Sequence, residues 1–210
     1  MSLSSILLDV LGEIVAPSVC AACDEPVGPR VLFCGACAPS VSILDDRGAA
    51  FAYGGAVATA IARLKFRGRP ELASRLGAAM AEVAPRDVDV VVPVPLHVRR
   101  LAERGFNQSA LVAAAYANRL GLRHLPRALR RTRDTAHQLH LPRHARAGNV
   151  IGAFACKMQG SLVDKRVLLV DDVTTTGATL QACADAVRAS GARAIETLAL
   201  ARREWTEPMR

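Results

Sequence analysis

The stretch from Val167 to Thr179 constrains the fold of this chain more than any other. It reads Val-Leu-Leu-Val-Asp-Asp-Val-Thr-Thr-Thr-Gly-Ala-Thr. Four apolar residues with β-branched ends predict a buried strand, and the residues from Gly177 onward predict a helix. Two carboxylates and a turn rich in hydroxyl groups fill the joint between them. In an open α/β sheet such a joint lies outside the carboxyl end of a strand, which is where ligands bind.

The side chains of this joint suit two chemical groups. Asp171 and Asp172 offer adjacent acceptors for a vicinal diol, and hydroxyl and backbone N–H groups at a helix start suit a phosphate. A ligand with a ribose and a 5′-phosphate would use both. An acidic pair also ends a strand in P-loop ATPases, but that class needs a G-x-x-x-x-G-K-[ST] loop, and no lysine of this chain follows a glycine. A helix-capping role would explain one carboxylate, but not two beside three threonines and a glycine.

Composition limits the class of protein. The 210 residues can form one domain with a small appendage, and 51% hydrophobic residues exclude general disorder. No apolar run approaches the ~20 residues that span a bilayer, and the N-terminus lacks the basic start of a signal peptide. We therefore expect a cytoplasmic protein without membrane insertion. The net charge of +8 is compatible with nucleic acid or phosphorylated ligands, but only five Phe, two Tyr and one Trp are present, so any stacking surface for bases must be small.

Cysteines indicate a metal site near the N-terminus. Cys20 and Cys23 form one C-x-x-C pair, and Cys34 and Cys37 form a second pair ten residues later. Four thiolates so spaced match a tetrahedral structural zinc site, which replaces a core that fewer than fifty residues cannot supply. Two disulfides are the alternative, which a cytoplasmic chain disfavours. We expect an N-terminal region of residues 1–48, with an amphipathic helix around residues 3–14 before a zinc ribbon, and a larger domain of residues 49–210.

Strands and helices alternate in the larger domain. Asn107 is a plausible N-cap for one of the helices. The expected strands are 49–53, 88–94, 150–155, 166–171 and 194–200, and the expected helices are 55–66, 71–83, 107–120 and 177–190. This alternation predicts a Rossmann-like α/β fold with a mostly parallel sheet flanked by helices.

The run from Val167 to Thr179 resembles the 5-phosphoribosyl-1-pyrophosphate (PRPP) signature of the type I phosphoribosyltransferases. In that family the two acids hold the ribose hydroxyls and the following turn holds the 5′-phosphate. The resemblance implies that the diol-binding residues are Asp171 and Asp172. It assigns the phosphate to Thr174, Thr175, Thr176, Gly177, Ala178 and Thr179.

Other stretches resemble the ComF family. They are Leu64 to Gly68, Val91 to His97, Arg99 to Gln108 and Arg131 to Gln138, which Arg146 and Asn149 continue. With the four N-terminal cysteines, the resemblance covers nearly the whole chain. It implies a phosphoribosyltransferase-like protein associated with competence for DNA uptake, with single-stranded DNA or a DNA-uptake protein as a partner.

Arginines are expected to act on the pyrophosphate. A pyrophosphate that leaves a ribose carbon carries several negative charges, which Mg²⁺ and arginine side chains can bind. Arg99, Arg100 and Arg104 lie just past a predicted strand, although a solvated basic helix start would also explain them. The polar segment 131–146 is expected to form a hood that excludes water, from which Arg131 and Arg133 would reach the pyrophosphate. The histidines of this segment are expected to be surface residues.

Two functions remain open at this point. The first is a Mg²⁺-dependent phosphoribosyltransferase with an unidentified acceptor, such as a base. The second is a non-catalytic PRPP-sensing module that binds single-stranded DNA or a DNA-handling partner. No residue is identified that would recognise a nucleobase, which favours the binding module, and no oligomeric state is indicated.

Overall fold

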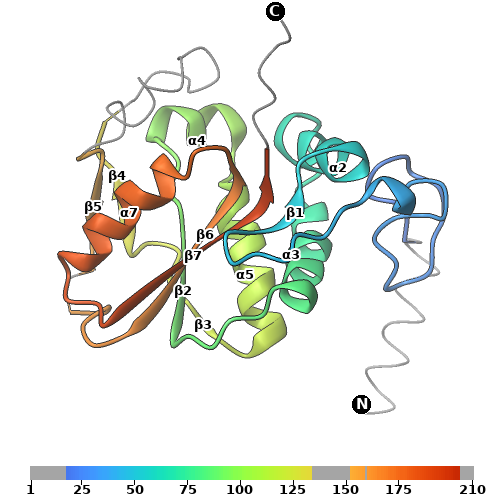
Figure 1. Cartoon of the computed structure of the whole chain (residues 1–210). Coiled ribbons are helices and arrows are strands. Elements are labelled where there is room, and N and C mark those ends of the chain that lie inside the picture. Colours follow the sequence, from blue (N-terminus) through green and yellow to red (C-terminus); the bar gives the residue numbers. More distant parts are fainter. Residues whose placement is uncertain (1–17, 134–151, 159, 204–210) are drawn as a thin grey trace, which may run out of the picture.

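A parallel sheet forms the centre of the molecule (Figure 1). The computed structural model describes residues 18–133, 152–158 and 160–203. Five strands lie in the order β1-β7-β6-β2-β3, and every neighbouring pair is parallel. They are β1 (Ala49–Ala52), β2 (Val90–Pro93), β3 (Arg123–His124), β6 (Arg166–Thr174) and β7 (Ala194–Arg202). A separate antiparallel pair consists of β4 (Leu129–Arg131) and β5 (Phe154–Cys156). The predicted α/β fold with a mostly parallel sheet is confirmed.

Helices cover both faces of the sheet. One face packs against α2 (Gly55–Phe66), α3 (Leu72–Val83) and α5 (Gln108–Leu120), and the other packs against α7 (Ala178–Arg188) and the β4–β5 pair. A shorter helix, α4 (Val98–Arg104), follows β2, and a 3₁₀ turn, η1 (Ala38–Ser40), precedes β1. Along β6, Leu168 and Val170 belong to the first core and Val167 and Leu169 to the second. This alternation is the two-residue period of a strand that is buried on both faces.

The four helices predicted within the described residues are confirmed, and several strands differ from the prediction. In place of the strand predicted over 150–155, the described residues form a strand only from Phe154 to Cys156. Asn107 caps α5 as expected, because its side-chain oxygen accepts a hydrogen bond from Ser109 N at 3.1 Å. The strand predicted to end at Asp171 continues to Thr174, and the last strand continues to Arg202. Strands β3 and β4 were not predicted. They are two and three residues long and consist mostly of Arg and His, so they lack the apolar runs on which a strand prediction depends.

The N-terminal region contacts the sheet directly. Residues 42–44 run antiparallel to β1, with hydrogen bonds from Leu44 N to Ala50 O at 3.0 Å and from Ala52 N to Ser42 O at 2.9 Å. Ile43 and Phe51 form the corresponding bridge. The boundary predicted at Gly48 lies between this segment and β1, and it stays a prediction.

Several expectations concern residues outside the described ranges. These are the amphipathic helix of residues 3–14 and the hood residues beyond Arg133, which include His137, His140, His144, Arg146 and Asn149. Among the helices of residues 18–133, 152–158 and 160–203, none has the length and apolar content needed to cross a bilayer.

Candidate functional site

The predicted carboxylates lie inside β6, at the point where β2 leaves it. The pairing of β2 with β6 ends at Pro93 and Val170, followed by one hydrogen bond from Val94 N to Val170 O at 2.8 Å. From Asp171 to Thr174, β6 pairs only with β7. The strand was predicted to end at Asp171, but it continues for three more residues, so both acids lie inside it. The edge of β6 that opens beside them is the kind of place at which parallel α/β sheets bind ligands.

Asp171 is buried and held by two donors. Its Oδ1 accepts hydrogen bonds from Ser109 Oγ and from Asp172 N, both at 2.9 Å. Burial raises the pKa of Asp171 to about 7, the charge of Asp172 adds to the increase, and Lys65 and Ser109 oppose it. Near neutral pH this carboxyl group is therefore partly protonated, and it can either donate a hydrogen bond to a ligand hydroxyl or accept one.

Asp172 forms an ion pair with Lys65, a residue to which the sequence assigned no role. The distance from Lys65 Nζ to Asp172 Oδ2 is 2.9 Å, and the Lys65 side chain is 17% exposed. Oδ2 is buried and has no well-aligned hydrogen bond, so this ion pair is its main compensation. Lys65 comes from the last turn of α2 and belongs to the Leu64–Gly68 stretch. The scarcity of lysine is the sequence feature that could have identified this residue, since Lys65, Lys157 and Lys165 are the only lysines in an arginine-rich chain.

Lys65→Met is expected to lower the free energy of unfolding by about 2 to 4 kcal/mol, because it leaves the buried Asp172 carboxylate without a counter-ion. Asp172→Asn in the Lys65→Met background should recover part of this loss. Urea denaturation of the two single variants and the double variant would give the coupling energy. Lys157→Met, at an exposed position, should change stability by less than about 0.5 kcal/mol. Equal losses for Lys65→Met and Lys157→Met would contradict the ion pair.

The turn after the carboxylates has the expected position. Thr174 ends β6, and Gly177 caps α7 with φ +76°, a left-handed conformation that favours glycine. Ala178 N donates to Thr176 Oγ1 at 3.4 Å. The hydroxyl groups of Thr174, Thr175, Thr176 and Thr179 and the first N–H groups of α7 thus follow directly after Asp172, and phosphate binding by this turn stays a prediction.

The three α4 arginines differ in how close they lie to the acids. Arg104 is partly buried, donates to Gln108 Oε1 at 2.6 Å, and lies with its guanidinium over the Phe66 ring at 5.3 Å. Burial lowers the pKa of Arg104, Asp172 raises it and Arg100 lowers it, so Arg104 is within electrostatic range of both residues. Arg99 is exposed and pairs with Glu103 at 3.3 Å. Arg104 is therefore the member of this group that the fold brings to the carboxylates.

The two hood arginines lie at the start of the predicted hood. Arg131 is in β4, with its guanidinium 5.5 Å from the centre of the Phe154 ring, and Arg133 is the last described residue before the gap. Burial and the charge of Asp171 raise the pKa of the Cys183 thiol, whereas Arg131 lowers it. Arg131 and Asp171 therefore both lie within electrostatic range of the buried Cys183 thiol in α7.

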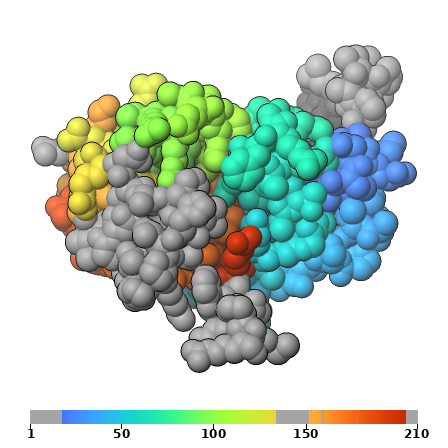
Figure 2. Space-filling model, turned by 90° about the horizontal axis from the view of Figure 1, so that it is seen from above, coloured from blue at the N-terminus to red at the C-terminus, as the bar shows by residue number. Residues whose placement is uncertain are grey.

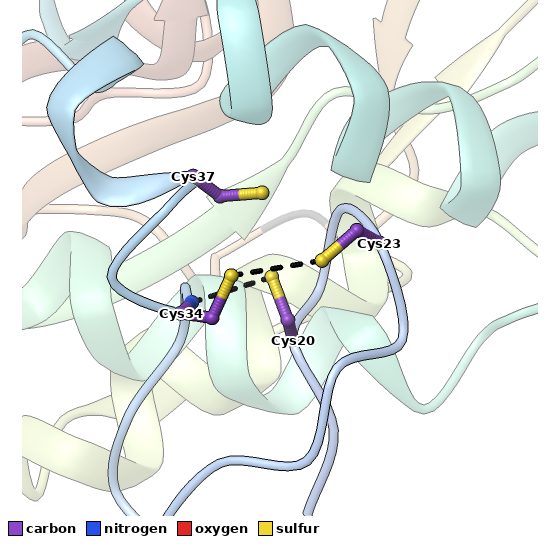
Figure 3. Close-up of side chains that lie close together, drawn as sticks. All are labelled: Cys20, Cys23, Cys34 and Cys37. Carbon is purple, nitrogen blue, oxygen red and sulfur yellow. Dashed lines mark hydrogen bonds between the residues drawn. The ribbon is translucent and has the colours of Figure 1, made fainter.

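The four cysteines converge on one point (Figure 3). Their sulfur atoms all lie within 4.8 Å of one another, and the Cys23 and Cys34 sulfurs are 3.6 Å apart. A tetrahedral zinc with Zn–S bonds of 2.3 Å separates its sulfurs by roughly 3.8 Å, so the arrangement fits this metal. Cys34 N also donates to Cys20 Sγ at 3.4 Å. Although burial raises the pKa of Cys20, backbone N–H groups bring it down to about 6, whereas Cys23 and Cys34 raise that of Cys37 to about 12.

Arginines of α2 and its neighbourhood hold the cysteine region against the larger domain. Arg63, only 6% exposed, donates to Ala21 O at 3.2 Å and pairs with Asp24. Arg69 also pairs with Asp24, at 3.1 Å. Arg75 of α3 donates to the carbonyl groups of Val19 and Val31. Sequence reasoning did not find these contacts, because a basic residue that binds a distant carbonyl group has the same local pattern as a solvated one.

Comparisons with known proteins identify a matching domain family and several related sequences. Residues 107–209 match the phosphoribosyl transferase domain family. The chain is 32% identical over 200 residues to the DNA utilization protein YhgH of Salmonella typhi, covering 88% of this chain and 84% of the relative. It is 31% identical over 156 residues to competence protein ComFC of Streptococcus pneumoniae, covering 73% and 67%. Among solved structures, the purine phosphoribosyltransferase of Pyrococcus horikoshii is 22% identical with a TM-score of 0.38, covering 67% of this chain and 77% of that one.

Proposed function

The chain belongs to the ComF family of phosphoribosyltransferase-domain proteins, and we propose that it binds PRPP with Mg²⁺ and transfers the phosphoribosyl group to an acceptor. The observation that carries the proposal is the buried Asp171–Asp172 pair at the open edge of β6, directly followed by the threonine-rich turn that starts α7. These features offer a diol-binding and a phosphate-binding region in the order that the ligand requires.

Each part of the ligand has a proposed partner. Asp171 and Asp172 bind the two ribose hydroxyls, and residues 174–179 bind the 5′-phosphate through hydroxyl and backbone N–H groups. Arg104 and the neighbouring Arg100 face the negative charge of the pyrophosphate. Arg131 and Arg133 contribute further positive charge from the start of the hood. Arg99 lies further out and contributes through its charge alone.

The residues also fit a bound Mg²⁺, since the two carboxylates and the oxygens of PRPP are the hard oxygen donors that this ion prefers. When bound, Mg²⁺ would neutralise part of the charge that builds up on the leaving pyrophosphate. In the transfer, the bond from ribose C1 to the pyrophosphate oxygen breaks and a bond from C1 to the acceptor nucleophile forms. The acceptor proton passes to solvent.

Calorimetry with PRPP and Mg²⁺, followed by a pyrophosphate-release assay with a panel of nucleobases, tests the proposal. We expect PRPP to bind and one class of acceptor to stimulate pyrophosphate release. Absence of PRPP binding would reject the whole proposal. Binding without release in the presence of any acceptor would reject the transfer and leave the second candidate.

That second candidate is a PRPP-sensing module that acts on single-stranded DNA. It is favoured by the net charge of +8 and by relatives whose names refer to DNA utilization and competence. In this case PRPP should change the affinity for a single-stranded oligonucleotide without being consumed. The affinity should also fall steeply with salt concentration, since phosphate contacts release counterions.

A further inference from the structure

Phe66 is unusually exposed for an aromatic residue. Its exposed fraction is 72%, the highest among the large apolar side chains of the described residues. Burying such a ring would remove a large apolar area from water, so an exposed one forgoes a substantial stabilisation. The chain has only eight Phe, Tyr and Trp residues in total. Most of the surface of this ring is therefore accessible to a ligand.

The ring lies beside the proposed phosphoribose site. Lys65, its neighbour at the end of α2, contacts Asp172 at 2.9 Å. Arg104, whose guanidinium lies over the ring at 5.3 Å, is also within electrostatic range of Asp172. Phe66 therefore has two neighbours near Asp172. Lys65 precedes it in the chain, and Arg104 lies over its ring. Figure 2 shows the molecule from above, and in this view the atoms of α2 lie next to those of the α4 region.

Helix α4, which supplies Arg104 to the ring, carries both apolar and basic side chains. Two side chains of α4, Val98 and Leu101, are exposed by 69% and 41%. Arg67, next to Phe66 in the chain, is exposed, and Arg100 of α4 is partly exposed. An exposed aromatic ring with Arg104 over it and Arg67 next to it in the chain is the kind of arrangement with which proteins bind unpaired bases, because the ring stacks on the base and the cations bind phosphate groups.

We propose that Phe66 is a nucleobase-stacking residue at the entrance of the phosphoribose site. Arg104 occupies one face of the ring, and the exposed remainder receives the flat surface of the base. The ligand that stacks on Phe66 is a planar heteroaromatic ring, which either a free base or a base of single-stranded DNA supplies. The inference depends on the proposed function only for the identity of the neighbouring site, because stacking itself needs no PRPP.

The experiment uses the full-length protein and two probes. A fluorescein-labelled dT oligonucleotide is titrated by anisotropy, and free adenine is titrated by calorimetry in the presence of Mg²⁺ and PRPP. Phe66→Ala should weaken binding of at least one probe by about 5- to 150-fold, the range expected for loss of one stacked base. Loss for the oligonucleotide alone identifies the strand as the source of the base, and loss for adenine alone identifies the free base.

Two further substitutions separate stacking from simple apolar contact. Phe66→Trp should retain the affinity, whereas Phe66→Leu, which keeps apolar volume but not the aromatic face, should lose as much as Phe66→Ala. For the oligonucleotide, the slope of log affinity against log salt should be unchanged in these variants, because no phosphate contact is removed. Arg67→Ala should instead reduce that slope by about 0.7 if this side chain binds a phosphate.

Tyr53 supplies the matched control. It also carries a guanidinium over its ring, from Arg203 at 4.4 Å, but it lies before α2 rather than at its end. Tyr53→Ala should leave both affinities within about twofold of the unmodified protein. The proposal is overturned if Phe66→Ala binds normally, if Phe66→Leu retains the affinity, or if neither probe binds a protein that binds PRPP. If PRPP itself fails to bind while Phe66→Ala still weakens oligonucleotide binding, the proposed function fails and the stacking role stands.

Discussion

Asp171→Asn is expected to weaken Mg²⁺-PRPP binding by about 10- to 150-fold and, at the same time, to make the ligand-free protein more stable at pH 8. The loss of affinity follows from replacing a charged acceptor of a ribose hydroxyl by a neutral one, since hydrogen bonds to charged groups contribute about 1.5 to 3 kcal/mol. The gain in stability follows from burial of Asp171 beside Asp172, where ionisation is opposed by desolvation and by a like charge. Replacing both acids should reduce PRPP binding below detection.

The pH dependence of this gain has a defined sign. The pKa of Asp171 is about 7 in the folded protein, against about 3.9 for an unperturbed aspartate. Between these two values the folded state binds more protons than the unfolded state, so the contribution of Asp171 to stability falls as the pH rises through this window. An asparagine does not titrate. The stability difference between Asp171→Asn and the unmodified protein should therefore be small near pH 4, grow up to about pH 7 and then level off, at no more than about 4 kcal/mol.

Urea denaturation at several pH values and calorimetry with PRPP would measure the two effects separately. Asp185→Asn is the matched control, because Asp185 lies on exposed α7 surface, where it pairs with Arg188 at 2.8 Å. This control should change neither PRPP affinity nor, by more than about 0.5 kcal/mol, stability. Unchanged PRPP affinity in Asp171→Asn would reject the ribose-binding role. A variant less stable than the unmodified protein at pH 8 would show that Asp171 is stabilised as a carboxylate.

The sequence predicted those parts of the fold that depend on local pattern. Val167 to Val170 could be assigned to a buried strand because four consecutive apolar residues satisfy both faces of a parallel sheet. Asn107 could be assigned to a helix start because its side chain satisfies an N–H group that the helix leaves unpaired. The C-x-x-C spacing likewise brings two sulfurs together on one turn. In each case the physical cause acts over a few residues, so it is visible in the sequence.

The contacts that complete the site depend on residues far apart in the chain. Lys65 meets Asp172 and Ser109 meets Asp171 only because α2 and α5 pack on the same face of the sheet beside β6. The end of β6 was misplaced for a related reason. A polar residue such as Asp172 normally weakens a strand, but here pairing with β7 continues to Thr174 and Lys65 compensates the buried charge. Tertiary contacts thus override the local preference at the site itself.

Zinc removal is expected to have the largest effect on the N-terminal region. We expect about one zinc ion per chain, and a chelator should unfold the cysteine region because zinc binding contributes about 10 to 16 kcal/mol in isolated zinc modules near pH 7. Cys37→Ser should have the same effect. Metal analysis, with circular dichroism or thermal denaturation before and after chelation, would measure both. Cys156→Ser is the matched control, since this partly exposed cysteine of β5 lies outside the cluster.

The larger domain should respond to zinc removal through Arg63. This buried side chain donates to Ala21 O and pairs with Asp24, and both partners lose their positions if the cysteine region unfolds. Arg63→Met should therefore destabilise the zinc-loaded protein by about 1 to 3 kcal/mol and have little further effect on the zinc-free protein, because the same contacts are already broken. Equal effects in both forms would show that zinc does not hold these contacts. A purified protein without metal, and with two disulfides by mass spectrometry under non-reducing conditions, would replace the zinc site by the disulfide alternative.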